Sequence, residues 1–291
     1  MWTVRGGRRS LPWTAPTIVI IPGFGPPRLH DKIRWLVNNM DAIRHGVDGL
    51  IQVFVFPYAE DAHTLLTTCS GIPCNTELWV RPWEKGLLGR FLFQNAAPDK
   101  MSFATKHVIV LLDDVEILGD PVRDLVSRLD WEGIHVVSPN ITTDSVSCHK
   151  FMFPLFMPGV FRRTNYAELF MYVMTRRGYE KWFGLLHDWT LYLWGIDMAM
   201  HPEGITIGIL EGTAIRHHII SDRSESSPVH AAMQQELRRY ARTHPSISFK
   251  FENIWTIGHA GALMLDMKQI NPRIIVEKMP DGGRVVTVAK R

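Results

Sequence analysis

The residues HVIVLLDDVEIL, at positions 107–118, form an apolar run of strand length that ends in three carboxylates. Residues 107–112 are mostly β-branched or leucine and lack a helical period, which predicts a strand buried on both faces in a parallel sheet. In an open α/β sheet, ligands bind at the carboxyl ends of the strands. The acids therefore mark a candidate ligand site, and the alternative is a solvated acidic turn.

Side chains alternate along an extended chain, so Asp114 and Glu116 are expected on one side of it and Asp113 on the other. Two carboxylates on one side suit a hard divalent cation, because Mg²⁺ and Mn²⁺ prefer oxygen ligands and share their coordination shell with substrate phosphates. The sequence thus predicts Mn²⁺ or Mg²⁺ as a cofactor.

The composition is that of a globular protein, with 291 residues of which 46% are hydrophobic and 21% charged. No period of 20–50 residues repeats and no low-complexity linker interrupts the chain, so a single domain over residues 1–291 is preferred to two. Lys and Arg exceed Asp and Glu by 32 − 29 = 3, so no strong field favours nucleic acid as a partner.

Targeting signals are weak. The longest apolar stretch, Phe151 to Phe161, contains two prolines and a glycine and is shorter than the roughly 20 residues that span a bilayer. The first residues, MWTVRGGRRSLPW, lack an apolar core of signal-peptide length, so a cytoplasmic protein without a transmembrane segment is expected. The three cysteines are Cys69, Cys74 and Cys148. They lack CxxC spacing, which favours a reduced, structural role over zinc binding.

A strand at residues 17–22, an amphipathic helix to about residue 40 and a strand at 51–56 predict a right-handed crossover and a parallel pair. Helix and loop are expected over 60–100. Farther along, the pattern predicts a helix at 121–129, a strand at 133–138, helices at 165–177 and 179–190, a strand at 205–210, a helix at 228–243 and a hairpin within 273–289.

The loop GFGPPR, residues 23–28, follows the first strand. Gly23 and Gly25 permit close approach of the backbone to a ligand. Prolines stand where the dinucleotide-binding motif needs a third glycine, and no Gly-Lys-Ser/Thr makes a P-loop, so both phosphate-binding motifs fail. Aromatic residues crowd together between 182 and 194, as either core or a platform on which an apolar sugar face stacks.

Four motifs carry a family resemblance. In order they are LDDVEI at 112–117, MPGVFR at 157–162, WGID at 194–197 and the strand with its histidine, IGILEGTAIRH, at 207–217. Over about residues 105–245 the chain resembles nucleotide-sugar glycosyltransferases of the GT-A type. It is most similar to a glycosyltransferase-like family of plants and bacteria with DDDIEI, MAPVFSR, WGLD and a single histidine. Leu112 replaces that family's first aspartate, so a ribose contact would come from Asp113 or elsewhere, or be absent.

The resemblance implies an α/β fold: a single Rossmann-like GT-A domain with a mostly parallel central sheet flanked by helices. About residues 15–140 would form the nucleotide-sugar-binding half and about 141–291 the acceptor-binding half. The implied reaction moves a sugar from a nucleoside-diphosphate sugar, with a UDP-sugar favoured, to a glycan, a glycoconjugate or another hydroxyl acceptor. A base opposite the leaving group would give inversion of configuration.

The resemblance also assigns residues. The metal ligands would be Asp114, Glu116 and His217, with His217 preferred to His218 because of its distance from the strand. Asp197 would be the catalytic base. The donor would contact Gly23, Gly25, Asp113 and Asp114, and the acceptor would contact Trp189, Trp194 and Arg162.

Two other functions remain open. A sugar- or nucleotide-binding protein could keep the fold without the chemistry, and Leu112 supports this alternative. A glycoside hydrolase needs two carboxylates, which Asp197 could form with Glu203 or Glu211. Asp197 could also be a helix N-cap with no part in catalysis.

Overall fold

The computed structural model describes residues 2–3, 16–68, 73, 75–83, 88–129, 133–145, 152–155, 158–218 and 228–247, and the strands 253–257, 264–265, 273–278 and 284–289. Residues 2–3, 228–230 and those last four strands are described by their backbone alone. Cys69, Cys74 and Cys148 lie outside the described residues, so the prediction for the cysteines stays a prediction.

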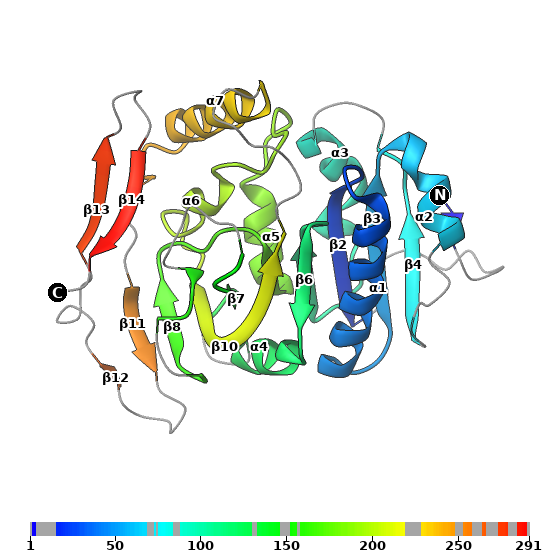
Figure 1. Cartoon of the computed structure of the whole chain (residues 1–291), viewed down its shortest axis with the longest axis horizontal. Coiled ribbons are helices and arrows are strands. Elements are labelled where there is room, and N and C mark those ends of the chain that lie inside the picture. The colour runs from blue at the N-terminus through cyan, green and yellow to red at the C-terminus, as the bar shows by residue number, and fades with distance from the viewer. Residues whose placement is uncertain are drawn as a thin grey trace.

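One mixed sheet of twelve described strands runs through the molecule, with β2, β3 and β4 toward one end and β8 and β11 toward the other (Figure 1). Its order is β1 (Trp2–Thr3), β4 (Thr76–Val80), β3 (Ile51–Pro57), β2 (Thr17–Phe24), β5 (His107–Leu111), β9 (Met171–Thr175), β7 (Val136–Ile141), β10 (Ile207–His217), β8 (Phe161–Thr164), β11 (Asn253–Ile257) and β12 (Met264–Leu265), with β6 (Val115–Leu118) also paired to β10.

The centre of this sheet is mostly parallel, as predicted. β4, β3, β2 and β5 pair in parallel, and so do β7 and β10. β9 is antiparallel to both β5 and β7, which therefore share one direction. The carboxyl ends of β2, β3 and β5 consequently lie at one edge of the sheet, where an open α/β sheet binds ligands.

The described helices are α1 (Leu29–Gly46), α2 (Ala62–Thr68), α3 (Leu88–Asn95), α4 (Pro121–Leu129), α5 (Arg176–Gly184), α6 (Ile196–Met200) and α7 (Pro228–Thr243), with 3₁₀ turns η1 (Ala59–Asp61) and η2 (Pro98–Lys100). None of these helices is both long and apolar enough to cross a membrane. β13 (Arg273–Lys278) and β14 (Arg284–Ala289) form the predicted hairpin as a separate antiparallel sheet.

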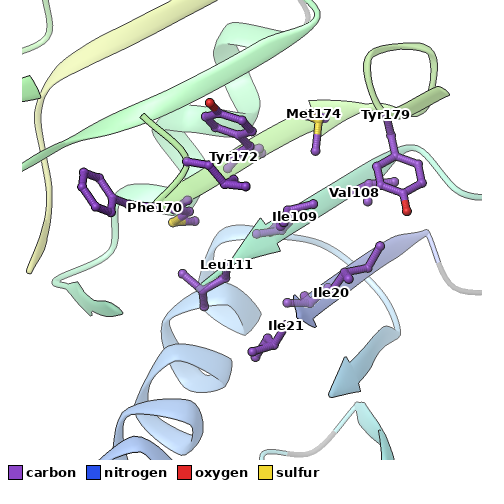
Figure 2. Packing of buried hydrophobic residues seen from close by; sticks show 14 of the residues in the cluster. Ile20, Ile21, Val108, Ile109, Leu111, Phe170, Tyr172, Met174 and Tyr179 are labelled. Atoms are coloured by element: carbon purple, nitrogen blue, oxygen red, sulfur yellow. The ribbon is translucent and has the colours of Figure 1, made fainter. Parts of the chain in front are cut away.

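The core is centred on β5, which lies between β2 and β9 (Figure 2). Val108, Ile109 and Leu111 of β5 are fully or almost fully buried. A strand covered on both faces needs no polar stripe, which is why the apolar run that starts at residue 107 has no alternation.

Two predicted elements are wrong. The helix expected at 165–177 is replaced by strand β9, because the residues MYVMT form a short apolar run buried in the middle of the sheet. Periodicity does not distinguish such a run from a buried helix. The segment 60–100 also contains a strand, β4, which extends the parallel sheet beyond β3.

The acids of residues 113–116 do not lie on one continuous strand. The chain turns at residues 113–114, and β6 starts at Val115 and pairs with β10 in antiparallel fashion. Asn39 of α1 holds β6 through its backbone: its Nδ2 donates to Val115 O at 2.7 Å, and its Oδ1 accepts from Ile117 N at 2.7 Å. Asn39 is buried, so its amide and two backbone groups of β6 satisfy each other away from water.

Replacing Asn39 by alanine should lower the free energy of unfolding by about 2–4 kcal/mol, because each buried backbone group left unpaired costs about 1–3 kcal/mol. The neighbouring Asn38 is exposed on the same helix, so Asn38→Ala should change stability by less than about 0.5 kcal/mol. Denaturant unfolding measures both. Equal effects of the two substitutions would mean that Asn39 does not hold β6.

Candidate functional site

A buried lysine joins three segments at the ligand edge of the sheet. Lys32 Nζ, on α1, donates to Asp113 Oδ2 at 2.6 Å and to Gly25 O at 2.6 Å. Gly25 N also donates to Asp113 Oδ2, at 3.2 Å. The side chains of Lys32 and Asp113 are 6% and 13% exposed, so this ion pair is largely shielded from water. The structure therefore brings the predicted donor residues Gly25 and Asp113 into direct contact.

Burial, followed by the adjacent charge of Asp114, raises the pKa of the Asp113 carboxyl to about 7, against the lowering effect of Lys32. Sequence reasoning missed Lys32 because it precedes the apolar face of α1, where a charged residue predicts a solvated flank. The one available signal is its position just after a glycine loop at a strand end.

A second cluster surrounds Gly25. A Cβ at this position would overlap the Tyr58 ring and come within 3.1 Å of Asp61 Oδ2, so only glycine fits. The Tyr58 ring stacks on Trp83, with ring centroids 5.3 Å apart. Asp61 is buried, and its Oδ2 has no hydrogen-bond partner among the described residues. Burial raises the pKa of Asp61, whereas the charge of Lys32 lowers it.

Tyr58 follows β3, Asp61 ends η1 and Trp83 follows β4, so these residues lie within or beside the segment expected to be irregular. No motif marked them. Gly23, the other predicted donor glycine, is the last but one residue of β2 and has φ of 71°, a left-handed conformation that favours glycine.

Asp114 and His217, which lie far apart in the sequence, are in contact, as predicted. His217 Nε2 lies 3.3 Å from Asp114 Oδ2, and both residues are buried. Two further contacts fix this geometry: His218 N donates to Asp114 O at 2.9 Å, and His217 N donates to Ser145 Oγ at 3.0 Å. The Phe170 ring packs 4.5 Å from the His217 ring, centroid to centroid.

Glu116 belongs to a different group. Its Oε2 lies 3.2 Å from His218 Nε2 and 3.5 Å from Arg216 Nη1, and the His218 ring stacks on Trp35 with centroids 3.8 Å apart. The expectation that Asp114 and Glu116 share one side is wrong, because Asp114 sits in the turn before β6 and strand alternation begins only at Val115.

Among the described residues, no three His, Cys, Asp or Glu side chains come close enough to hold a metal ion. The set Asp114, Glu116 and His217 is therefore not assembled in this structure. The pair of Asp114 and His217 still fits Mn²⁺ or Mg²⁺ in its chemistry, since a carboxylate and an imidazole are suitable donors and such ions take further ligands from water and substrate phosphates.

Asp197 lies in α6 and is buried. Its Oδ2 accepts a hydrogen bond from the Tyr166 hydroxyl at 3.0 Å, and its Oδ1 accepts from Met198 N at 2.9 Å. The N-cap of α6 is Gly195, with φ of 101°. Asp197 is thus the second residue of the helix, and the interpretation of Asp197 as an N-cap is wrong.

The residues expected to bind the acceptor fall into two kinds. Trp189 is half-buried against α7, with His187 stacked on it at 4.6 Å and the guanidinium of Arg239 at 4.4 Å from its ring centroid. Trp194 is also half-buried and lies in the loop before Asp197.

Arg162 is fully buried and forms an ion pair with Glu211 across β8 and β10. Burial lowers the pKa of the Arg162 guanidinium, and the charge of Glu211 opposes this. Arg162 is therefore part of the core, and its expected contact with an acceptor is wrong. The same pair removes Glu211 as the second carboxylate of a hydrolase, and Glu203 is exposed.

A mixed sheet whose central strands mostly run in one direction, flanked by helices, defines a Rossmann-like α/β fold. No protein-family model and no curated protein matches the chain. The crystal structure of a mycobacterial protein is 14% identical and covers 89% of each chain, with a TM-score of 0.49.

The crystal structure of GalNAc-T7 with UDP, GalNAc and Mn²⁺ is 10% identical, with a TM-score of 0.50, and covers 81% of this chain and 56% of that chain. This chain thus spans little more than half the length of the GalNAc-T7 chain. The likeness shows that the protein has a GT-A-like fold.

Replacing Lys32 by methionine should lower the free energy of unfolding by about 3–5 kcal/mol, because it leaves a buried carboxylate without its counter-charge. Arg34→Met, at an exposed position on the same helix, should cost less than about 0.5 kcal/mol. Denaturant unfolding gives both values. Adding Asp113→Asn to Lys32→Met should restore part of the loss, and a double variant with no recovery would contradict a direct pair.

Proposed function

We propose that the protein is a metal-dependent glycosyltransferase that moves a sugar from a UDP-sugar to a hydroxyl group of a glycan or glycoconjugate. The observation that carries this proposal is the contact of Asp114 with His217 beside the Gly25 loop, in a GT-A-like fold. The solved GalNAc-T7 structure contains UDP and Mn²⁺, which supports the same class of donor and cofactor here.

On the donor side, Gly23 and Gly25 let the backbone approach a diphosphate. Asp61 offers a buried carboxylate oxygen beside the stacked rings of Tyr58 and Trp83. This combination suits a flat pyrimidine base, whose N–H would donate to the carboxylate and whose face would stack on an aromatic ring. Asp113 would support this side indirectly, since its Oδ2 is shared by Lys32 and Gly25.

Asp114 and His217 would hold the divalent cation. When bound, such a cation offsets the negative charge that builds on the leaving nucleoside diphosphate. The two residues come from the turn after β5 and from the end of β10, so they would hold the donor diphosphate at the strand ends. Glu116 is not retained as a ligand because it contacts His218 and Arg216.

On the acceptor side, Asp197 would take the proton from the acceptor hydroxyl as that oxygen attacks the anomeric carbon. The Tyr166 hydroxyl donates to the Asp197 carboxylate and orients it. A positioned base contributes on the order of 10²–10⁴ in rate. A base on the face opposite the leaving group gives inversion of configuration. Trp194, which is close to Asp197 in the sequence, would stack on an acceptor sugar.

A non-catalytic nucleotide- or sugar-binding protein is the second candidate. Its support is Leu112, which stands where the resembled family has an acid, together with the engagement of Glu116 by His218. This candidate predicts ligand binding without transfer of the sugar.

UDP should bind at least tenfold more tightly with Mn²⁺ than with excess chelator, because the carboxylates would otherwise repel the diphosphate. Asp114→Asn and His217→Ala should each abolish most of this difference, whereas His218→Ala should leave it nearly unchanged. Isothermal titration calorimetry measures the affinity for UDP of the wild type and of the three variants, with Mn²⁺ and with chelator. Equal affinity in Mn²⁺ and in chelator would remove the metal from the proposal.

Asp197→Asn should lower kcat by about 10²-fold or more, since the amide oxygen can still accept from Met198 N and its NH₂ can donate to the Tyr166 hydroxyl oxygen, but the amide cannot take a proton. UDP affinity and melting temperature should barely move. Initial rates at saturating donor and acceptor, together with a thermal melt, test this. Turnover near that of the wild type would exclude Asp197 as the base.

A further inference from the structure

Glu236 of α7 contacts the loop that precedes Asp197. One of its carboxylate oxygens, Oε2, accepts from Leu191 N at 2.7 Å and from Tyr192 N at 2.9 Å, and the other, Oε1, accepts from Trp194 N at 2.8 Å. Glu236 is buried. A single side chain, 42–45 residues away in sequence, thus binds three backbone N–H groups of residues 191–194.

This loop has no regular secondary structure to fix its path. Leu193 has φ of 58° and Gly195 has φ of 101°, so the backbone enters the left-handed region twice within three residues. Such a conformation is costly for a leucine and persists only where the surroundings hold it. Successive N–H groups that converge in this way form a concave binding site for an anion, here filled by the Glu236 carboxylate.

Other residues of α7 also pack against the loop that Glu236 binds. A Cβ on Gly195 would come within 3.0 Å of Leu237 Cδ1 and 3.2 Å of Tyr240 Cβ, so α7 packs directly on the backbone at this point. The Tyr240 hydroxyl lies 2.8 Å from Thr190 Oγ1. Helix α7 therefore sets the path of the chain on both sides of the three N–H groups.

Burial raises the pKa of the Glu236 carboxyl, and the three N–H groups lower it. The charge of Glu236 in turn raises the pKa values of Tyr192 and Tyr240, for both of which burial is the larger cause.

We propose that Glu236 is a positioning residue that holds residues 191–194, and so places Trp194 and Asp197 for attack by the acceptor. This inference rests on the proposed function and extends it to α7. Glu236 acts through the loop and does not itself touch the acceptor.

The test compares Glu236→Gln with Gln235→Ala, an exposed position one residue away on α7. Glutamine keeps the length of the side chain but replaces one acceptor oxygen by an NH₂ group, which faces N–H donors and cannot accept from them. Hydrogen exchange of the full chain is the first measurement. The amides of residues 191, 192 and 194 should exchange at least tenfold faster in Glu236→Gln, while those of β5 keep their rates and Gln235→Ala matches the wild type.

Steady-state kinetics with a UDP-sugar and a hydroxyl acceptor is the second measurement. In Glu236→Gln, kcat should fall by about tenfold or more and the acceptor KM should rise, while the donor KM and the Kd for UDP with Mn²⁺ stay within twofold. A purely structural role would lower the apparent kcat in proportion to the folded fraction and leave both KM values unchanged.

The outcomes separate the two proposals. Unchanged exchange of the three amides would overturn the inference, and so would faster exchange with kinetics equal to the wild type. Wild-type protein that transfers no sugar, but whose amides respond as expected, would overturn the proposed function and with it the catalytic role of the loop, leaving Glu236 as a structural contact alone.

Discussion

The contact of Lys32 with Asp113 and Gly25 is the constraint on which the site depends. Two adjacent carboxylates at a strand end repel each other, and burial makes this repulsion more costly. Lys32 offsets one of the two charges and ties it to the glycine loop, so Asp113 is directed toward α1 and β2. Asp114 then faces the opposite way, toward the end of β10. Asp113 and Asp114 therefore have different partners, because Lys32, a buried cation on α1, binds Asp113, whereas His217 contacts Asp114.

The polar side chains at the end of β10 belong to two separate groups, one around Asp114 and one around Glu116. His217 is the last residue of β10 and His218 follows it, and their side chains contact different carboxylates. His217 turns inward to Asp114, whereas His218 joins Arg216 on the side of Glu116 and stacks on Trp35. Asn39 holds β6 against α1 and keeps Glu116 in that second group. The result is a buried carboxylate–imidazole pair, Asp114 with His217, whose chemistry suits a cation. Beside it lies a half-buried pair, Glu116 with His218, whose groups contact each other.

What could be predicted from the sequence depended on regular structure. The buried strands, the glycine loop and the meeting of Asp113, Asp114 and Gly25 at one edge follow from apolar runs and the parallel rule. His217 followed from the family resemblance, which places a single histidine at that distance from a strand. Strand β9 was mistaken for a helix, because a short buried run carries no period. Glu116 was misplaced because alternation was extended through a turn. Lys32 and Asp61 were missed since their importance lies only in tertiary contacts.

The two halves of the candidate site are thus held in physically different ways. The proposed donor side is placed by the ends of paired parallel strands and by the contacts of Lys32 with Asp113 and Gly25. The loop before Asp197 has two left-handed residues and no strand partner, and α7 holds it through Glu236 and the packing of Leu237 and Tyr240 on Gly195. Changes in α7 are therefore expected to alter the loop before Asp197 while the strand ends keep their pairing. In the glycosyltransferase proposed above, such changes would act on the acceptor side first.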